Sequence, residues 1–142
     1  MKIYFASGWF TPEQMELMNK GMEATKRNKS IDHAFYPFEN QGATGHEFGT
    51  REWAEDQYLL DVSQLQSADI VVVALTTNNP DSGTAFEQGM AIAFNKPVVY
   101  VTDGNSGNLM NVMGNTVSVS VEELAELDFN NLPVNHWEGA YI

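Results

Sequence analysis

Ile70-Val71-Val72-Val73-Ala74-Leu75, followed closely by Asp81-Ser82-Gly83-Thr84-Ala85-Phe86-Glu87-Gln88-Gly89, is the stretch that decides the fold. Its first part is a β-branched apolar run, typical of a strand in a parallel sheet that is covered on both faces. Its second part predicts a helix that begins just beyond that strand. Ligands of open α/β folds bind outside the carboxyl ends of strands, so the pattern predicts that Glu87 lies at a functional site.

Glu87 has unusual helical neighbours for a charged residue. Gly83, Met90 and Ala91 lie three or four positions away, and therefore on the same face of the predicted helix. A carboxylate on an apolar stripe is unfavourable unless it has a partner or a chemical task. A glutamate at the surface or in an interface is the simpler alternative, and the pattern alone leaves it open.

Strands and helices alternate along the rest of the chain. Apolar runs predict strands over Lys2–Ser7, Ala34–Phe38, Ile70–Leu75, Pro97–Thr102 and Val117–Val119. Helical patterns cover residues 12–29, 50–68, 82–94 and 121–127, whereas the segments 39–49, 103–114 and 128–142 are predicted to be irregular. This alternation predicts one α/β domain over residues 1–142, with a doubly wound five-stranded parallel sheet of flavodoxin-like order 2-1-3-4-5. In that order the loop Gly8-Trp9-Phe10 meets the loop that ends at Asp81.

Composition excludes several classes of function. The chain has seven Lys and Arg against nineteen Asp and Glu, a net charge of −12, so it lacks the basic surface that binding a nucleic acid polymer requires. It has no cysteine, which removes disulfides, thiolate chemistry and zinc–cysteine sites. The sequence contains no export signal or long apolar run, so we expect a cytoplasmic protein that does not enter a membrane.

Three carboxylates are predicted to meet at one edge of the sheet: Glu87, Asp81 and Asp61. Aspartate near a helix start is commonly a cap, and Asp61 also fits a solvated helix residue, so both have structural alternatives. Together in an uncharged, aromatic-lined pocket, such groups can separate their pKa values into an ionised nucleophile and a protonated acid. Chemistry at the anomeric carbon of a sugar requires that division.

Other chemistries find no pattern in the sequence. Gly8 stands alone after the first strand, so no Walker loop, dinucleotide fingerprint or flavin phosphate loop is present. His33, His46 and His136 lack the spacing of metal ligands, and there is no serine nucleophile elbow. We therefore expect neither a metal nor a cofactor.

A set of short segments, spread over the chain, matches one known family. The segments are Ile3-Tyr4-Phe5-Ala6-Ser7-Gly8-Trp9-Phe10, Glu39-Asn40-Gln41, residues 81–89, Asn108-Leu109-Met110 and Glu138-Gly139-Ala140-Tyr141-Ile142. In this order they resemble the nucleoside 2-deoxyribosyltransferases. The resemblance implies a doubly wound α/β protomer, assembled as a homohexamer of dimers. It also implies exchange of the base of a 2′-deoxyribonucleoside for a free nucleobase, with retained β configuration.

The resemblance also implies roles in catalysis. Glu87 matches the nucleophile that attacks C1′ and carries a covalent deoxyribosyl intermediate. Asp81 matches the aspartate that exchanges a proton with the base, and Asp61 matches one that helps orient the base or the sugar. Tyr4 resembles the phenol that fixes the rotamer of the nucleophile.

Further positions are implied to bind the substrate. Gln41 resembles a base contact, and the loop Gly8-Trp9-Phe10 supplies an apolar wall. Asn108 resembles a residue that reaches the sugar hydroxyl in the site of a neighbouring subunit, a role that makes assembly necessary for activity. The carboxylate of Ile142 is implied to hold the phenol of Tyr4.

One position departs from the family pattern. Gln88 is polar where an apolar residue is common. We expect this side chain to point away from Glu87 and to affect packing or an interface more than the mechanism.

Two rival functions fit the same fold. A 2′-deoxynucleoside 5′-monophosphate N-glycosidase needs cationic or hydroxyl donors around a phosphate, and Lys2, at the start of the first strand, is the one cationic residue near that strand. A non-catalytic nucleoside- or flavin-binding module explains the aromatic residues, but it gives no reason for the carboxylate of Glu87 on an apolar helix face.

Overall fold

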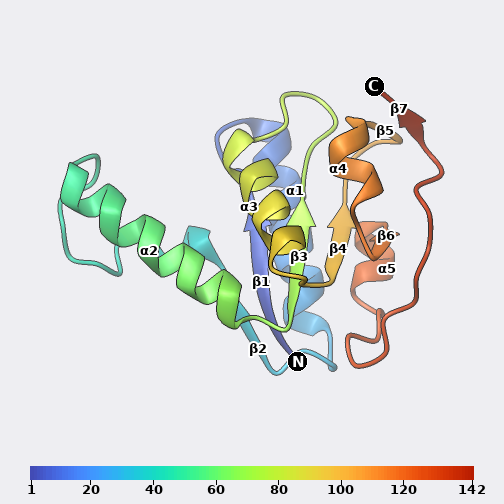
Figure 1. The fold of residues 1–142 in the computed structure, drawn as a ribbon, viewed down its shortest axis with the longest axis horizontal. Helices are drawn as coiled ribbons and strands as arrows, with labels where there is room; N and C mark the ends of the chain where they lie inside the picture. Colours follow the sequence, from blue (N-terminus) through green and yellow to red (C-terminus); the bar gives the residue numbers. More distant parts are fainter.

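A five-stranded parallel sheet forms the centre of the molecule (Figure 1). The computed structural model describes residues 1–142 and gives the strand order β2-β1-β3-β4-β6. The strands are β1 (Lys2–Ser7), β2 (His33–Phe35), β3 (Ile70–Ala74), β4 (Val98–Val101) and β6 (Val117–Val119). Because β5 lies outside this sheet, β6 is its fifth strand in chain order, and the predicted order 2-1-3-4-5 is confirmed.

Helices cover both faces of the sheet. They are α1 (Pro12–Arg27), α2 (Arg51–Ser67), α3 (Ser82–Ala93), α4 (Leu109–Met113), α5 (Val121–Leu124) and the 3-10 helix η1 (Pro37–Asn40). Successive strand residues point to opposite faces, so β1 serves two separate cores. Ile3 and Phe5 enter the core under α1 and α5, which we call the α1-side core. Tyr4 and Ala6 enter the core under α2, α3 and α4, the α3-side core.

The helix starts follow from local sequence. Thr11, Thr50 and Asp81 are the N-caps of α1, α2 and α3, and each side chain accepts a hydrogen bond from the backbone N–H three residues on. Such caps satisfy backbone donors that have no partner within the helix. The cap at Asp81 places α3 directly after the fully buried strand β3, as the sequence predicted.

The second strand is shorter than predicted. β2 ends at Phe35 and η1 begins at Pro37, whereas the predicted strand continued to Phe38. Proline has no N–H for a strand ladder, but its fixed φ suits the first turn of a helix. Pro37, which the predicted strand included, therefore lies beyond its end and begins η1.

Two segments that were predicted to be irregular contain regular structure. β5 (Ser106–Gly107) and β7 (Ala140–Tyr141) pair in parallel as a separate two-stranded sheet, and α4 follows β5 directly. Gly107 allows the close packing here, because an added Cβ would lie 2.6 Å from a methyl carbon of Val112. The paired residues are far apart in the sequence, so no local pattern reveals the pairing.

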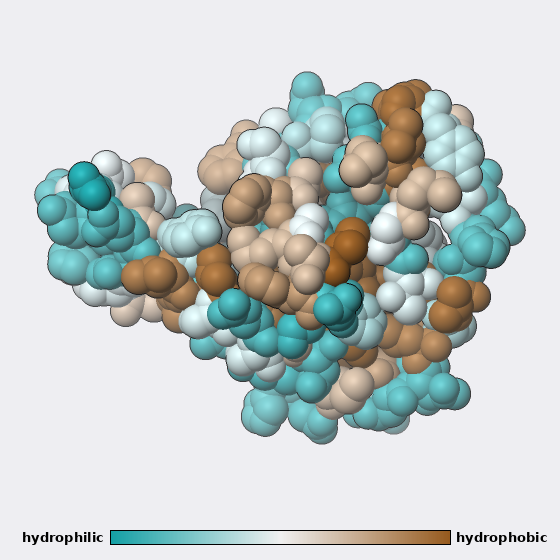
Figure 2. Space-filling view, in the orientation of Figure 1, coloured by the Kyte–Doolittle hydropathy of each residue, from teal (hydrophilic) through white to brown (hydrophobic).

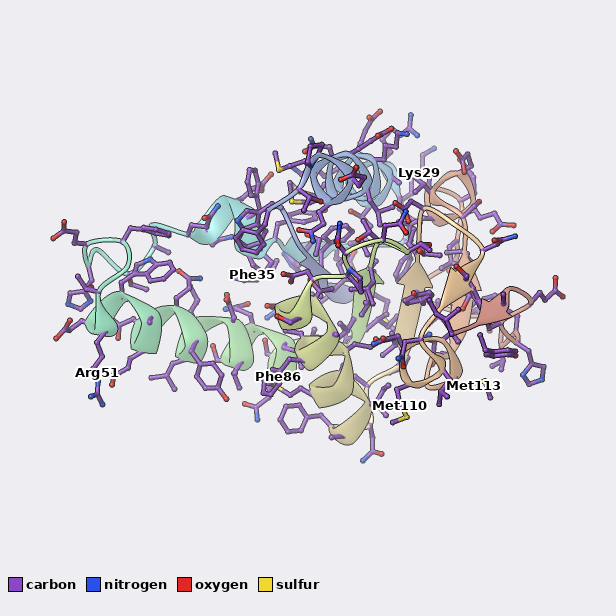
Figure 3. All side chains as sticks on the ribbon, turned by 90° about the horizontal axis from the view of Figure 1, so that it is seen from above. Lys29, Phe35, Arg51, Phe86, Met110 and Met113 are labelled. Carbon is purple, nitrogen blue, oxygen red and sulfur yellow. The ribbon has the colours of Figure 1, made fainter.

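The helix α2 projects from the body of the molecule, with Arg51 at its outer end (Figures 1 and 3). Leu65, near the other end, is its one buried residue. Trp53 Nε1 donates to the carbonyl of Gln41 at 3.0 Å, so the loop before α2 folds back onto this helix. None of the helices combines the length and apolar character of a membrane span.

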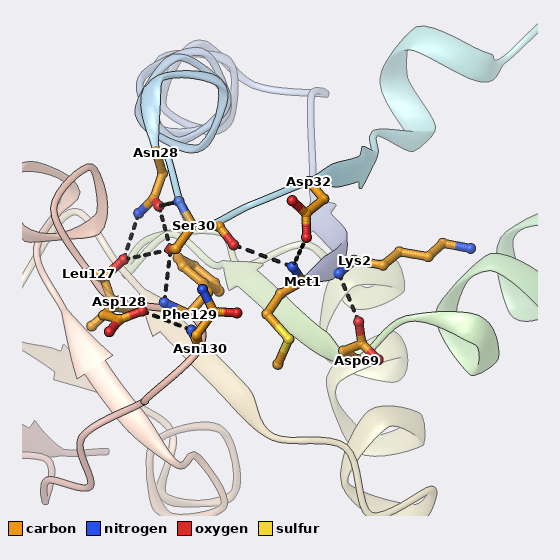
Figure 4. Close-up of polar contacts among 10 residues, drawn as sticks. All are labelled: Met1, Lys2, Asn28, Ser30, Asp32, Asp69, Leu127, Asp128, Phe129 and Asn130. Atoms are coloured by element: carbon orange, nitrogen blue, oxygen red, sulfur yellow. Dashed lines mark hydrogen bonds and ion pairs between the residues drawn. The ribbon is translucent and has the colours of Figure 1, made fainter.

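Polar contacts tie the end of α1 to the segment after α5 (Figure 4). Asn28 Nδ2 donates to the carbonyls of Leu124 and Leu127, at 3.0 and 2.8 Å. Ser30 Oγ accepts from the backbone N–H of Phe129 at 2.9 Å. These bonds close the α1-side core on the face opposite to α3.

Candidate active site

Tyr4 and Glu87 face each other from different layers of the fold. Tyr4 is fully buried in the middle of β1, on the face that α3 covers. Glu87 is on α3, and its Oε2 atom is buried without a hydrogen-bond partner, as is the hydroxyl of Tyr4. Buried polar atoms are almost always paired in folded proteins. Two unpaired ones together mark a place built for a ligand or for chemistry.

Burial dominates the electrostatics of Glu87. It raises the pKa of this carboxyl to about 8, with the Tyr4 hydroxyl opposing the shift and the charges of Asp61 and Asp81 adding to it. Burial likewise raises the pKa of Tyr4, and the negative charges of Glu87 and Asp61 raise it further. Perturbed groups that cluster in this way are typical of functional sites. The structure therefore brings Glu87, Tyr4 and Asp61 together.

Asp61 and Glu87 line the same small cavity between α2 and α3. Its volume is about 170 Å³, and the lining residues are Tyr58, Asp61, Val62, Leu65, Gly83, Phe86, Glu87 and Met90. Burial raises the pKa of Asp61 to about 6, and a hydrogen bond from Gln57 Nε2 at 3.1 Å opposes that shift. The lining contains no Lys or Arg, so nothing cationic offsets the two carboxylates.

Asp81 has the capping role that was its structural alternative. Its Oδ2 accepts from the backbone N–H of Thr84 at 2.8 Å and from the hydroxyl of Thr84 at 2.7 Å. The cap uses one carboxylate oxygen, while the charge of Asp81 still acts on Glu87. Capping and a place beside Glu87 are therefore compatible.

Gly8 and Gln14 join the loop after β1 to the loop before α3. An added Cβ at Gly8 would lie 2.6 Å from both Asp81 Cβ and Gln14 Oε1. Gln14 Oε1 accepts from the N–H of Phe10 at 2.9 Å, and its Nε2 donates to the carbonyl of Asn79 at 2.8 Å. The predicted meeting of these two loops is confirmed, and Gln14 holds them together.

Aromatic side chains gather beside this edge. The ring of Trp9 lies 5.3 Å from that of Phe10 and 5.6 Å from that of Phe38. Gln41 Nε2 donates to the carbonyl of Phe38 at 3.0 Å, which places Gln41 next to the same cluster. Phe10 is 71% exposed, so its ring is available to a ligand.

Sequence reasoning missed two residues at the site. Phe35 stacks on Tyr4 with ring centroids 5.7 Å apart, because the two are paired in the register of β1 and β2. Gln57 holds Asp61, and its own Oε1 is buried without a partner. The position of Gln57, one helical turn before Asp61, is a signal that could have identified it.

Two predicted residues lie elsewhere in the protomer. Asn108 is exposed and caps α4, with Oδ1 accepting from the N–H of Met110 at 2.9 Å. Ile142 is exposed beside it, and its carbonyl accepts from the N–H of Leu109 at 3.3 Å. Neither lines the cavity of Asp61 and Glu87, so one protomer does not bring them to Tyr4.

The rest of the molecule holds no second group of the predicted site residues and no set of metal ligands. A larger cavity, of about 780 Å³, lies between β6 and the C-terminal segment, but none of the predicted site residues lines it. No group of three His, Asp or Glu side chains lies close enough together to hold a metal ion.

The strand order defines a class: doubly wound α/β proteins, which bind ligands outside the carboxyl ends of the strands at the switch point of the sheet, here between β1 and β3. Residues 3–127 match the family model for nucleoside 2-deoxyribosyltransferase. The chain belongs to the nucleoside 2-deoxyribosyltransferase family.

Individual relatives agree with this assignment. The chain is 31% identical to a nucleoside deoxyribosyltransferase of Lactobacillus leichmannii, over 97% of this chain and 96% of that protein. A nucleoside deoxyribosyltransferase of Limosilactobacillus fermentum is 26% identical over 91% and 85% of the two chains. The solved 2-deoxyribosyltransferase of Bacillus psychrosaccharolyticus superimposes with a TM-score of 0.86, at 30% identity, over 96% of this chain and 99% of that one.

Proposed function

We propose that this protein transfers the 2-deoxyribosyl group between nucleobases through a covalent intermediate on Glu87. The observation that carries the proposal is the unpaired, buried carboxylate oxygen of Glu87 beside Tyr4, in a cavity shared with Asp61. Family membership supports a nucleoside as the substrate. The absence of Lys and Arg from the cavity lining favours a nucleoside over its 5′-monophosphate.

Base exchange then takes place in two half-reactions. A carboxylate oxygen of Glu87 attacks C1′, the C1′–N bond breaks, and its electron pair leaves with the base, which takes a proton from Asp81. The incoming base then returns a proton to Asp81 while its nitrogen attacks C1′, and the electron pair of the ester bond goes back to Glu87. Two displacements at one carbon retain its configuration. Each step is easier than a single direct exchange.

The raised pKa values of Glu87 and Asp61 indicate which of the two carboxyls holds a proton between turnovers. With a pKa of about 8, Glu87 keeps its proton at neutral pH, whereas Asp61, at about 6, is mostly ionised. Attack therefore requires that the proton pass from Glu87 to the acid that serves the base. The hydroxyl of Tyr4 favours the ionised form of Glu87, because it lowers the pKa of that carboxyl. In this scheme Tyr4 prepares the nucleophile.

Assembly of several copies belongs to the same proposal. A cavity of about 170 Å³ is smaller than typical small-molecule sites, which run from about 300 to 1,000 Å³. Asn108 and Ile142 lie outside it, so in our proposal they complete the site of a neighbouring copy in a homohexamer. The apolar side chains that this requires are exposed on α3, on its C-cap residue and on α4: Phe86, Phe94, Leu109, Met110 and Met113. Figure 2 shows brown and tan surface over these helices, and Figure 3 shows Phe86, Met110 and Met113 on one side of the molecule.

The test is exchange between thymidine and adenine in phosphate-free buffer, followed by chromatography. We expect deoxyadenosine and thymine from the wild type, no exchange from Glu87→Ala, and normal exchange from Glu52→Ala, which removes an exposed glutamate of α2. Mass spectrometry of enzyme quenched with substrate should show the deoxyribosyl group on the peptide that contains Glu87.

Three outcomes would overturn the proposal. Release of free deoxyribose without any new nucleoside would make the protein a hydrolase. Wild-type turnover in Glu87→Ala would remove the covalent mechanism. A wild type that is silent with both thymidine and deoxyinosine would contradict base exchange itself.

A further inference from the structure

Gln88, the residue after Glu87, is a fully buried amide in the middle of α3, with 1% of its surface exposed. Burying an amide is unfavourable unless its donors and acceptor are paired. Here every group is paired. Gln88 Nε2 donates to the carbonyl of Asn111 and to Asn115 Oδ1, both at 2.7 Å, and Gln88 Oε1 accepts from Asn111 Nδ2 at 2.8 Å.

Gln88, Asn111 and Asn115 form a closed unit, which we call the amide cluster. Asn115 Nδ2 closes it by donating to the carbonyl of Asn111 at 2.7 Å. Asn111 belongs to α4 and Asn115 follows it, so the amide cluster joins the middle of α3 to the last turn of α4. Packing is tight at the same place, because an added Cβ at Gly114 would lie 2.6 Å from Ile92 Cδ1.

The amide cluster also fixes the turn that begins α4. The backbone N–H of Asn111 donates to the carbonyl of Asn108 at 2.9 Å, while the side chain of Asn111 is bonded to Gln88. The carbonyl of Asn108 also accepts from the N–H of Val112 at 3.1 Å. A continuous line of hydrogen bonds therefore runs from Gln88 through Asn111 to Asn108.

Glu87 and Gln88 point to different partners. Consecutive helix residues are about 100° apart around the axis, so Glu87 faces α2 while Gln88 faces α4. Gln88 does not line the cavity of Asp61 and Glu87. A role for Gln88 in its own protomer's cavity therefore has no contact to act through.

We infer that Gln88 is a positioning residue for the neighbouring copy: through the amide cluster it sets the place of Asn108, which enters the site of another protomer. The inference rests on the proposed function, in which Asn108 completes a neighbour's site. One helix then serves two sites. Its Glu87 side carries the protomer's own nucleophile, and its Gln88 side supports what that protomer lends to its neighbour.

The variant Gln88→Leu keeps a branched side chain, one bond shorter, and removes all its hydrogen bonds. We expect the KM for the deoxynucleoside to rise about tenfold with a smaller change in kcat. A tenfold rise corresponds to a loss of about 1.4 kcal/mol in the free energy of binding. Gln66→Leu, at an exposed glutamine of α2, is the matched control and should behave as the wild type.

Complementation separates action in trans from a local packing defect. Glu87→Ala and Gln88→Leu chains, each with a different amino-terminal tag, are co-expressed, and oligomers that carry both tags are isolated. A Gln88→Leu protomer has an intact Glu87, and a Glu87→Ala neighbour supplies a correctly held Asn108. Random mixing then makes about one quarter of the sites fully intact. At substrate concentrations well below the wild-type KM, where the Gln88→Leu parent has lost about tenfold, activity per protomer should exceed that of either parent oligomer.

Two outcomes would overturn the inference. If the mixed oligomer shows only the average activity of its parents, Gln88 acts on its own protomer and the inference is wrong. A monomeric wild type that still exchanges bases would overturn it too, whereas a wild type without exchange would remove the proposed function first. If Gln88→Leu does not fold, Asn115→Ala, which removes two bonds of the amide cluster and leaves Gln88 bonded to Asn111, takes its place in the same experiment.

Discussion

At the scale of single residues, the fold disfavours the ionised form of Glu87. Its ordinary pKa of 4.5 rises to about 8 in the fold, mainly because the carboxyl is buried. A pKa shift of this direction is a statement about stability, since the folded state binds a proton that the unfolded chain releases. Between the two pKa values, the buried carboxyl of Glu87 therefore lowers the stability of the fold.

This gives a prediction for Glu87→Gln. Below pH 4.5 the carboxyl is protonated in both states and contributes nothing; between there and about pH 8 only the unfolded chain ionises, so wild-type stability falls as the pH rises. A glutamine resembles the protonated acid and does not titrate. At pH 8 we expect the variant to melt about 4 °C or more above the wild type. At pH 4 we expect the variant and the wild type to melt at the same temperature.

Differential scanning calorimetry at the two pH values measures this difference. Glu52→Gln, on the exposed side of α2, should show no pH-dependent gain. A Glu87→Gln variant that is less stable than the wild type at pH 8 would contradict the burial of an ionisable Glu87.

The pKa of Asp61 is raised by burial and lowered by a hydrogen bond from Gln57. Burial raises the pKa of Asp61 to about 6, and the hydrogen bond from Gln57 limits that rise because it stabilises the ionised carboxylate. We therefore expect Gln57→Leu to move the pKa of Asp61 above 6, as measured by a carboxyl ¹³C NMR titration. Gln66→Leu serves as the control, and an unchanged or lower pKa in Gln57→Leu would show that Gln57 does not hold Asp61 in solution.

At the scale of elements, the approach of the β1–α1 loop to the start of α3 tolerates no side chain at Gly8. Gly8→Ala forces Asp81 and Gln14 to move, because the new Cβ would lie 2.6 Å from each. We expect a loss of about 1–3 kcal/mol in the free energy of unfolding, together with slower base exchange.

Gly89 is the matched control, because it lies on the exposed side of α3 with nothing within 4 Å of an added Cβ. Gly89→Ala should stabilise the protein by about 0.5–1 kcal/mol, since alanine is the better helix former. Chemical denaturation measures both variants. Equal stability of Gly8→Ala and the wild type would show that the two loops are not in close contact.

Elements with a strong local pattern were predictable, and those that depend on distant partners were not. The apolar run of β3 and the cap at Asp81 specify a strand and a helix without help from the rest of the chain. The predicted end of β2 was wrong, because the chain turns at Pro37. The strands β5 and β7 were missed because each consists of two residues that only their pairing defines.

The residues of the candidate site also fall into those that the sequence predicted and those that it did not. Glu87, Asp81 and Asp61 followed from the topology and from carboxylates in unusual positions. Phe35 and Gln57 were missed because they are recognisable only through their neighbours, the one stacked on Tyr4 and the other bonded to Asp61. The proposed roles of Asn108 and Ile142 stay predictions, since no single protomer contains the contacts that they require.

At the scale of the whole molecule, the apolar surface of α3 and α4 predicts assembly. Met110 is 75% exposed on α4, which is a large apolar side chain left to solvent in an isolated protomer. Met110→Asp should leave the fold of the protomer unchanged, because the position is exposed. It should break the oligomer, because an unpaired charge in an apolar interface is unfavourable, and exchange activity should fall with it.

Sedimentation velocity follows the assembly, and circular dichroism follows the fold. Val134→Asp, at a position that is 77% exposed away from α3 and α4, is the control and should assemble normally. Identical sedimentation of Met110→Asp and the wild type would place the interface elsewhere.

The two cores that β1 serves have a consequence for how such a protein can change. Ile3 and Phe5 pack beneath α1, while Tyr4, between them in the sequence, packs on the face that carries Glu87. Mutational libraries confined to the α1-side core should therefore vary thermal tolerance while base preference stays constant. Libraries on the opposite face should change base preference and thermal tolerance together, because the residues around Tyr4 are both a buried core and the surroundings of the proposed site. Alternate positions of one strand therefore differ in whether a substitution that alters stability also alters the proposed site.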